Sequence, residues 1–195
     1  MANITLKNVT AGAIKGELNL AIPDREFVVL TGAAENSTIV RLMAGLEDVS
    51  KGEIFFDDRR VDGIAPKDRD VALVAHDYTP YPHLSVFENL AIGLRRRKFA
   101  DTEIRKRIAA VAAIFRLEAR LEGNAGSLSA EQRRLVGLAR AMVRQPKVYL
   151  FDEPFAGLDP AAARDGRAEI VRLHQRSSAT MVFATTNAAE ALALG

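Results

Sequence analysis

A short apolar run that ends in two adjacent carboxylates constrains the fold of this chain more than any other feature. Residues 148–151 read Val-Tyr-Leu-Phe, too few for a helix, and Asp152 and Glu153 follow directly. Pro154 cannot donate a backbone hydrogen bond, so the strand is expected to end there. The run predicts a buried parallel strand that places both acids at the carboxyl edge of a sheet, where open α/β folds bind ligands.

Composition is that of one ordinary soluble domain. The 195 residues are 48% hydrophobic and 27% charged, and the net charge of +2 does not favour nucleic-acid binding. The chain has no cysteine, which excludes disulfides, thiolate catalysis and zinc–thiolate sites. It has no signal-peptide pattern. None of its apolar runs approaches the length of roughly 18 residues that is needed to span a bilayer. We therefore expect a cytosolic protein that reaches a membrane only through partners.

Further apolar runs predict the remaining strands of an α/β fold. The continuous run at 27–30 predicts a central parallel strand covered on both faces, and a helix is expected over 39–44 up to Gly45. The expected strands cover residues 4–9, 17–22, 27–30, 52–56, 71–74 and 180–184.

Polar residues mark the expected starts of the later helices. The expected caps are Asp101, Ser129 with Gln132 as a capping box, Asp159 before Pro160, and Asn187 with Glu190. An apolar stripe at helical spacing follows the first of them and is expected to be core: Ile104, Ile108, Val111, Ile114 and Phe115.

Strand, glycine, short loop, Ser-Thr and helix, in that order, are typical of a phosphate-binding loop. The working motif is G-x-x-x-x-G-K-[ST], in which backbone N–H groups and the lysine hold the phosphates. This chain reads Gly32-Ala33-Ala34-Glu35-Asn36-Ser37-Thr38, with Asn36 for the lysine, Glu35 for the second glycine, and a loop two residues shorter. Repulsion by Glu35 (about 1–4 kcal/mol) and the lost lysine contact (about 1.5–3 kcal/mol) predict ATP binding weakened by several powers of ten.

Three segments resemble motifs of the ABC-transporter ATPases. Residues 148–159 resemble the Walker B motif and D-loop, residues 127–141 the signature region, and residues 81–90 the segment after the Q-loop in the sugar-importer branch. The resemblance runs from Ile4 to Leu194. It implies an α/β fold with a RecA-like P-loop NTPase core, an N-terminal antiparallel β-layer and an inserted helical subdomain. One domain would cover 1–195, with the core at 1–84 and 145–195 and the helical subdomain at 85–144.

The resemblance also implies which residues form the site. It assigns catalytic roles to Glu153 as general base, to Asp159 in the D-loop, and to Thr186 at the position of the switch histidine. Ser37 and Asp152 would hold Mg²⁺. His76 takes the place of the Q-loop glutamine, and an imidazole can ligate a metal but lacks the amide. The residues expected to contact ATP are Gly32, Asn36, Ser37, Thr38, His76, Ser129 and Gln132.

The departures from the family pattern fall where ATP would be touched. Besides the phosphate loop, His76 and Thr186, the signature glycines are replaced by Ala130 and Glu131, and residues 10–13 offer no aromatic ring for adenine. The leading hypothesis is therefore an ATP-binding subunit of a sugar-type importer whose ATP binding and hydrolysis are lost or strongly impaired. ATP and Mg²⁺ are implied by the resemblance alone.

The expected partners are transmembrane transporter subunits and a second nucleotide-binding subunit, with no nucleic acid, on the inner face of the cell membrane. Two alternatives remain open: a functioning Mg-ATP hydrolase with unusual motifs, and a nucleotide-independent module that docks on a transmembrane subunit through residues 81–98. The basic run Arg95-Arg96-Arg97-Lys98 is expected to be a solvated helix end, with acidic partners as the alternative. The match stops before the family's last strands, which predicts an exposed sheet edge.

Overall fold

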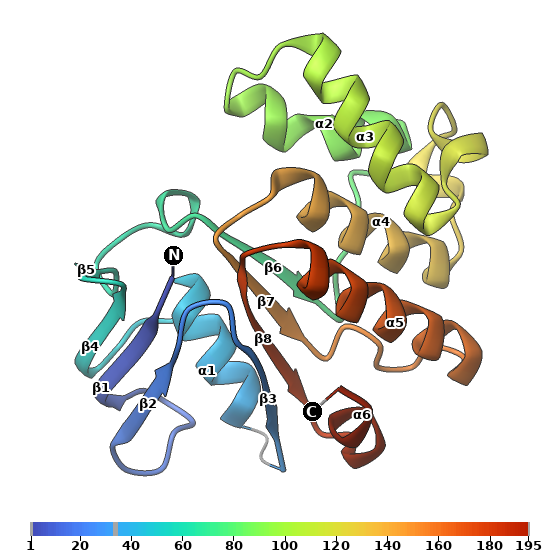
Figure 1. Ribbon diagram of the computed structural model, residues 1–195. Helices are drawn as coiled ribbons and strands as arrows, with labels where there is room; N and C mark the ends of the chain where they lie inside the picture. The colour runs from blue at the N-terminus through green and yellow to red at the C-terminus, as the bar shows by residue number, and fades with distance from the viewer. Residues whose placement is uncertain (1, 33–34, 195) are drawn as a thin grey trace. The chain divides into compact units, whose positions relative to one another are not determined.

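The computed structural model describes residues 2–32 and 35–194 (Figure 1). The chain divides into two compact units, which are taken separately below. The first comprises Met1–Ala75, Pro146–Pro154 and Ile170–Gly195, and the second comprises His76–Gln145 and Phe155–Glu169. Within the described residues, no helix has the length and apolar character needed to cross a bilayer.

A four-stranded parallel sheet forms the centre of the first unit, in the order β3-β8-β7-β6. Its strands are β3 (Phe27–Thr31), β6 (Val71–Ala75), β7 (Val148–Asp152) and β8 (Thr180–Thr185). Every residue of β7 and β8 is buried, which is why both strands are continuous apolar runs in the sequence. The predicted parallel strand that delivers Asp152 to the carboxyl edge is confirmed.

Strand β3 differs from its prediction. Among the described residues it pairs only with β8, at one edge of the sheet, and residues 27–30 are half-buried. The expectation of a central strand covered on both faces is therefore wrong for the part of the chain that the structure describes. An apolar run reports the surroundings of its side chains, whereas the number of neighbouring strands depends on hydrogen bonds made by the backbone.

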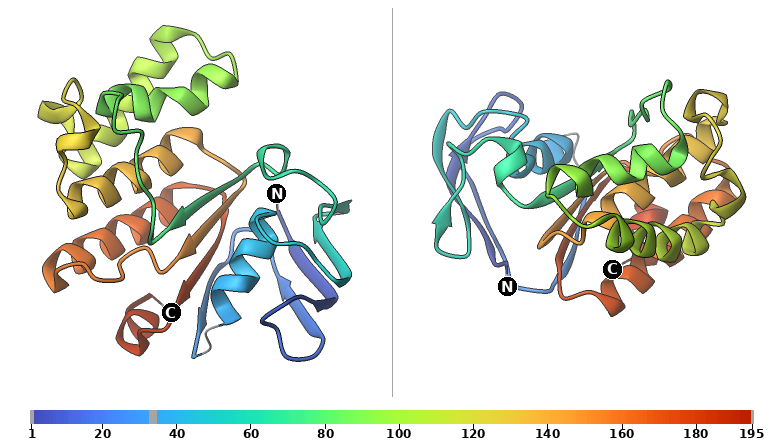
Figure 2. Two further views of the ribbon diagram at one scale, coloured as in Figure 1. Left: turned by 180° about the vertical axis from the view of Figure 1, so that it is seen from behind. Right: turned by 90° about the horizontal axis from the view of Figure 1, so that it is seen from above.

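An antiparallel sheet and helix α1 complete most of the first unit. The sheet has the order β2-β1-β4-β5, and its strands are β1 (Ile4–Thr10), β2 (Leu18–Ile22), β4 (Lys51–Phe56) and β5 (Arg59–Arg60). Helix α1 (Glu35–Ala44) buries Val40, Leu42 and Met43 in a core shared with both sheets (Figures 1 and 2). Each fully buried side chain of this size stabilises the unit by about 1.5–3 kcal/mol. Packing on two sides therefore fixes α1 firmly.

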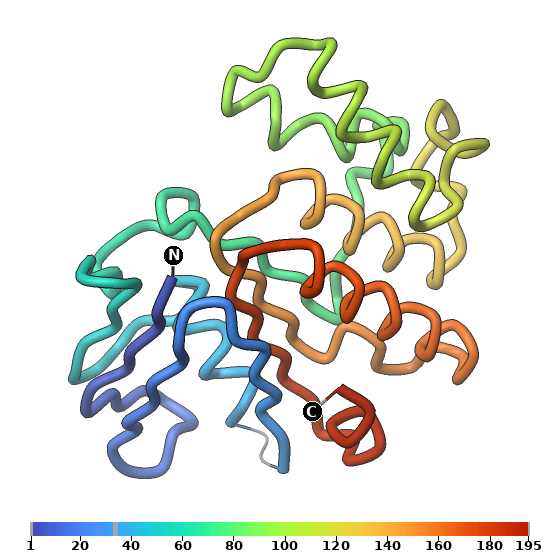
Figure 3. The backbone as a smooth tube through the Cα atoms, in the orientation of Figure 1, coloured from blue at the N-terminus to red at the C-terminus, as the bar shows by residue number. Residues whose placement is uncertain are grey.

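The second unit is helical and contains α2 (Val86–Arg96), α3 (Asp101–Phe115) and α4 (Ala130–Arg144) (Figure 3). Helix α5 (Pro160–Arg176) begins in this unit and ends in the first, to which α6 (Ala188–Leu194) also belongs. Short 3-10 turns lie at Pro66–Asp68, Glu118–Arg120 and Ala125–Ser127.

The start of α3 corrects one predicted cap. Asp101 is the first residue of the helix, and its N-cap is Ala100, which makes no side-chain cap hydrogen bond. An acid in the first turn still interacts favourably with the helix dipole, so the same residue type serves one position further on. The apolar stripe is core as expected, with Ile104, Ile108 and Phe115 buried and Ile114 partly buried.

Candidate functional site

The N-terminus of α1 carries the residues of the altered phosphate loop. Gly32 follows β3 with a φ of 86°, and α1 begins at Glu35, while Ala33 and Ala34 lie outside the described residues. Asn36 is 8% exposed, and its side-chain Nδ2 has no hydrogen-bond partner among the described residues. A buried N–H group without a partner costs about 1–3 kcal/mol. This helix end therefore holds one unsatisfied donor and one carboxylate.

Ser37 and Asp152 form a short polar contact in the site. Ser37 Oγ donates a hydrogen bond of 2.5 Å to Asp152 Oδ1, joining the first turn of α1 to the end of β7. Asp152 is 2% exposed, and Thr38, the next residue of α1 and of the predicted site, is buried as well. The structure thus brings together the two predicted metal ligands. Within the described residues, no three acidic or histidine side chains gather in a way that could hold a metal ion by themselves.

Glu153 is held by the strand beside it. Its φ is 48°, in the left-handed region, and its N–H donates to Ala184 O at 3.0 Å. One carboxylate oxygen accepts the backbone N–H of Thr186 at 2.5 Å, and the other lies 3.2 Å from Thr185 Oγ1. One oxygen of the predicted general base is therefore bonded to backbone N–H, and the other lies within reach of the Thr185 hydroxyl.

Thr185 connects Glu153 to the start of α6. Its Oγ1 donates to Glu190 Oε2 at 2.9 Å and accepts the N–H of Asn187 at 3.1 Å. Because a hydroxyl carries one proton, Thr185 can donate to only one carboxylate at a time. Thr185 and Glu190 are both buried, so this network of polar groups is shielded from water.

The cap of α6 is half of what the sequence predicted. Asn187 Oδ1 accepts the N–H groups of Ala189 (3.0 Å) and Glu190 (3.3 Å), as an N-cap does. The second bond of a capping box, from Asn187 N–H to the side chain of Glu190, is replaced. The N–H of Asn187 donates to Thr185 Oγ1 instead, and that hydroxyl donates to the side chain of Glu190. Thr185 was missed as a member of the site, since a threonine ending a buried strand carries no distinguishing signal in the sequence.

The other predicted site residues belong to the second unit. His76 is exposed and follows β6. Ser129 and Gln132 make the predicted capping box of α4, with bonds of 3.0 and 3.2 Å between side chain and backbone. Asp159 Oδ1 accepts the N–H of Ala161 at 2.8 Å and caps α5, as predicted. The observed contacts of Ser129, Gln132 and Asp159 are those of helix caps. The catalytic or nucleotide-binding roles of these three residues and of His76 stay predictions.

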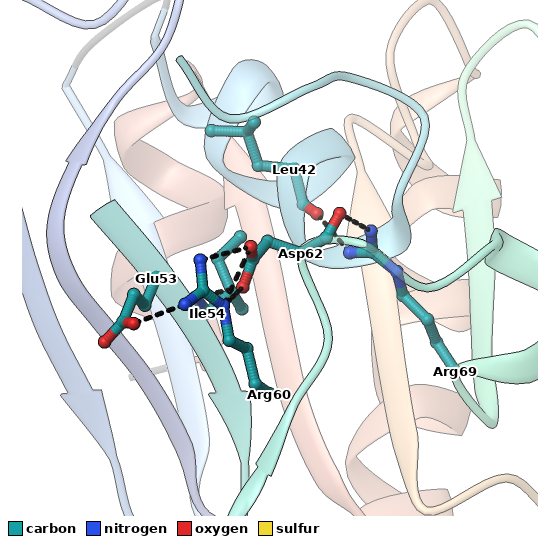
Figure 4. Close-up of polar contacts among 6 residues, drawn as sticks. All are labelled: Leu42, Glu53, Ile54, Arg60, Asp62 and Arg69. Atoms are coloured by element: carbon teal, nitrogen blue, oxygen red, sulfur yellow. Dashed lines mark hydrogen bonds and ion pairs between the residues drawn. The ribbon is translucent and has the colours of Figure 1, made fainter. Parts of the chain in front are cut away.

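Arg69 closes the other end of α1 and was also missed by sequence reasoning. The side chain is 5% exposed, and its guanidinium donates to Leu42 O at 2.7 Å in the last turn of the helix (Figure 4). The guanidinium also donates to Met43 O at 3.2 Å. It also donates to Ile64 O and Asp62 O. Burial lowers the pKa of Arg69. An arginine before a predicted strand gives no warning that it will be buried, so only the tertiary structure identifies it.

The loop that supports Arg69 is tied down by a second arginine. Arg60 pairs with Asp62 at 2.9 Å and with Glu53 at 2.5 Å (Figure 4). Burial acts to raise the pKa of Asp62, but the hydrogen bond from Arg60 and the N–H of Ile54 outweigh it and lower that pKa. This pairing holds the backbone of Asp62, whose carbonyl accepts from Arg69.

Comparison with known proteins identifies related sequences. A sequence-family model described as "ABC transporter" matches residues 16–156. The oligosaccharides import ATP-binding protein MsmX of Bacillus subtilis (strain 168) is 44% identical over 180 residues, covering 91% of this chain and 49% of that protein. The sn-glycerol-3-phosphate import ATP-binding protein UgpC of Bordetella pertussis (strain Tohama I) is 42% identical over 202 residues, covering 100% of this chain and 56% of that protein. The chain spans about half the length of these curated relatives.

Solved structures share the fold. A nucleotide-free ATP-binding cassette from an ABC transporter superposes with a TM-score of 0.82 at 19% identity, over 100% of this chain and 85% of that one. A dimeric cassette in a post-hydrolysis state, bound to ADP and phosphate, gives a TM-score of 0.84 at 22% identity, over 96% and 90%. The predicted α/β fold, with a parallel core and an antiparallel layer, is confirmed.

Proposed function

The chain belongs to the ABC transporter family, and on that premise we propose that it is an ATP-binding-cassette subunit of a solute importer in which ATP binding and hydrolysis are lost or strongly impaired. The names of its relatives favour a sugar or glycerol phosphate as the solute. Its partners would be transmembrane subunits and a second nucleotide-binding subunit, which would hold it at the inner face of the cell membrane.

The N-terminus of α1 carries this proposal. A helix N-terminus attracts phosphate through its free N–H groups and dipole, and a lysine normally supplies the charge that completes the site. Here Glu35 brings a carboxylate to the first turn, and Asn36, whose buried Nδ2 has no partner among the described residues, stands where the lysine belongs. These residues do not fit a triphosphate, because the site offers it a like charge and no cation.

The metal end of the site fits better than the phosphate end. Ser37 Oγ and Asp152 Oδ1 lie 2.5 Å apart, and a hydroxyl and a carboxylate are oxygen ligands of the type that Mg²⁺ prefers. Mg²⁺ usually keeps several waters and shares its remaining positions with substrate phosphates. Two ligands without a phosphate site give the metal little affinity, so we expect weak Mg²⁺ binding.

The surroundings of Glu153 favour impaired hydrolysis as well. A general base needs a free carboxylate oxygen within hydrogen-bond reach of the water it activates. One oxygen of Glu153 accepts Thr186 N–H at 2.5 Å, and the other is open to a water only while Thr185 Oγ1 donates to Glu190, so fewer acceptor positions remain for that water. Thr186 also has no ring nitrogen with which to serve as the switch residue.

Calorimetric titration of the purified chain with ATP, with and without Mg²⁺, tests the proposal. We expect no measurable binding at millimolar ATP. The double change Glu35→Gly with Asn36→Lys should tighten binding by at least about tenfold, because it removes a repulsion and restores a charge-assisted contact. The control Thr102→Lys with Ala113→Lys adds the same two positive charges at exposed positions of the second unit and should leave binding unchanged.

Micromolar binding of Mg-ATP by the natural chain would contradict the proposal. It would favour a functioning hydrolase with unusual motifs, and Glu153→Gln would then be expected to abolish turnover. Equal gains from the double change at Glu35 and Asn36 and from the control at Thr102 and Ala113 would show that net charge, rather than the α1 terminus, limits binding.

A nucleotide-independent docking module is the second candidate, favoured by the way the loop before α2 is fixed. The fully buried side chain of Asn89 accepts from Tyr81 N–H (2.7 Å) and donates to Tyr81 O (3.1 Å) and Ser85 O (2.9 Å). This surface is therefore rigid without any ligand. Capture of a transmembrane partner without nucleotide would support the docking role if Phe87→Ala abolished it. Capture that is unaffected by this change would contradict the docking role.

A further inference from the structure

An arginine of α4 lies against two tyrosine rings of the loop that precedes α2. The guanidinium carbon of Arg140 is 5.7 Å from the ring centre of Tyr78 and 5.2 Å from that of Tyr81. Its Nη1 donates a hydrogen bond of 3.2 Å to the hydroxyl of Tyr78. All three residues belong to the second unit.

The second unit fixes both tyrosines without a ligand. Gly137 is buried in the middle of α4, and a Cβ there would lie only 2.6 Å from Cδ1 of Tyr78. Glycine therefore leaves the space in which the Tyr78 ring packs on the helix. Asn89 bonds to both the N–H (2.7 Å) and the C=O (3.1 Å) of Tyr81, which holds the backbone of that residue in place.

The positive charge of Arg140 has no counterion within the described residues. No ion pair joins it to an acid, whereas Arg60, Arg95 and Arg107 each pair with a carboxylate. Tyrosine hydroxyls are uncharged near neutral pH, and burial raises the pKa of Tyr78 further. Two hydroxyls also cannot accept all five N–H groups of a guanidinium. Arg140 therefore keeps both charge and donors for a ligand.

The guanidinium can be reached from outside. Arg140 is partly exposed, Tyr81 is 39% exposed, and His83, whose ring centre lies 6.1 Å from that of Tyr81, is exposed as well. Burial acts to lower the pKa of Arg140, but hydrogen bonds with Tyr78 and Tyr81 outweigh it and raise that pKa. A ligand would therefore meet a permanent, partly shielded cation beside two exposed rings.

We propose that Arg140 binds a carboxylate of the protein that docks on this loop, while an apolar side chain of the same protein rests on Tyr81 and His83. The inference rests on the docking role proposed above for residues 81–98 and names the chemistry of the partner. The planar fork of a guanidinium matches a carboxylate, and partly desolvated arginines and tyrosines contribute strongly at protein interfaces. A free phosphate would use the fork but not the rings.

Titration of the natural chain with a short peptide tests the carboxylate site without the partner. The probes are acetyl-Leu-Glu-Leu-amide and its glutamine analogue, which has nearly the same shape and no charge. The Nε–H signal of Arg140 in NMR spectra, identified by its absence in Arg140→Lys, reports the contact. We expect the glutamate peptide to shift this signal saturably and the glutamine peptide to bind at least about tenfold more weakly, because the charge-assisted hydrogen bonds are lost.

Matched variants separate Arg140 from net charge. Arg140→Gln should weaken binding of the glutamate peptide, followed by tyrosine fluorescence, at least about tenfold. Lys106→Gln removes the same charge from an exposed position of the second unit and should leave binding unchanged. An unshifted Arg140 signal in the natural chain, equal binding of the two peptides, or equal losses in the two variants would overturn the proposal. Tighter binding of inorganic phosphate than of the glutamate peptide would also overturn it.

Capture of a transmembrane transporter subunit separates this inference from the docking role. Loss of capture in both Phe87→Ala and Arg140→Gln, with full capture in Lys106→Gln, would support both. Loss in Phe87→Ala with full capture in Arg140→Gln would overturn the carboxylate site alone. Full capture in Phe87→Ala would contradict the docking role, and the peptide titration, which needs no partner, would then decide whether Arg140 binds a carboxylate.

Discussion

The two ends of helix α1 are completed in opposite ways. At the C-terminus, Gly45 turns the chain with a φ of 77°, its N–H bonds to Leu42 O at 3.1 Å, and the N–H of Leu46 bonds to Arg41 O at 2.9 Å. Arg69 then satisfies carbonyls of the last turn. At the N-terminus, the buried amide of Asn36 has an unpartnered donor within the described chain.

This contrast separates the requirements of the fold from those of nucleotide binding. A bound phosphate and an acidic side chain both stabilise a helix N-terminus, because each places negative charge at the positive end of the dipole. Glu35 supplies that charge from within the chain. The helix can therefore keep its place between the sheets without a bound phosphate.

Of the substitutions at the two ends of α1, Arg69→Ala should change the stability of the protein most. The change removes a buried guanidinium and takes a hydrogen-bond donor from the carbonyl oxygens of Leu42, Met43, Asp62 and Ile64, so we expect a loss of about 3–5 kcal/mol in the free energy of unfolding. Urea denaturation followed by circular dichroism measures it. Arg59→Ala is the control, since Arg59 is exposed and should change stability by less than about 0.5 kcal/mol. If the two variants lost similar amounts of free energy of unfolding, Arg69 would not be the residue that stabilises this end of the helix.

Gly45→Ala should have a smaller effect at the same end. Alanine is strained at this positive φ, and its Cβ would lie 2.6 Å from the guanidinium carbon of Arg69. We expect a loss of about 1–3 kcal/mol in the same assay. Gly63→Ala provides the control, because a Cβ there has no neighbour within 4 Å. A harmless Gly45→Ala would mean that the turn and Arg69 rearrange without cost.

Asn36→Leu, at the N-terminus of α1, should change the stability of the protein least. Replacing this side chain, whose buried Nδ2 lacks a partner among the described residues, with an apolar one should leave stability unchanged or raise it by up to about 1 kcal/mol. The same substitution at Asn89 should cost at least about 2 kcal/mol, because that buried amide makes three hydrogen bonds. If the substitutions at Asn36 and Asn89 cost equal stability, the Asn36 side chain would have to make a stabilising hydrogen bond as well.

Sequence reasoning succeeded where one short segment decides the outcome. The strand ending in Asp152, the capping box of Ser129 and Gln132, and the cap made by Asp159 are all confirmed. The strand is indicated by one short apolar run, and in the two caps the residues that interact lie within a few positions of one another. Their side chains meet as soon as the local backbone forms.

Predictions failed where the partner comes from elsewhere or where two local partners compete. The run at 27–30 indicated burial, but its place at the edge of the described sheet depends on strand pairing. Glu190 had the right spacing for a capping box, yet Thr185 offers its side chain a buried hydroxyl at 2.9 Å. Asp101 was one residue out of place, because the backbone of Ala100 starts the helix without a side-chain cap.

The sequence by itself determined the family fold, the strand that carries Asp152 and Glu153, and the replacement of the phosphate-binding lysine by Asn36, since each follows from residue types at fixed spacing. Only the tertiary structure decided that both carboxylate oxygens of Glu153 contact the end of β8 and that Arg69 closes α1. Glu153 meets Thr186 across 33 positions, and Arg69 meets Leu42 across 27. Contacts over such separations form only when the sheet and its helix pack together, because no local backbone preference brings these groups within reach.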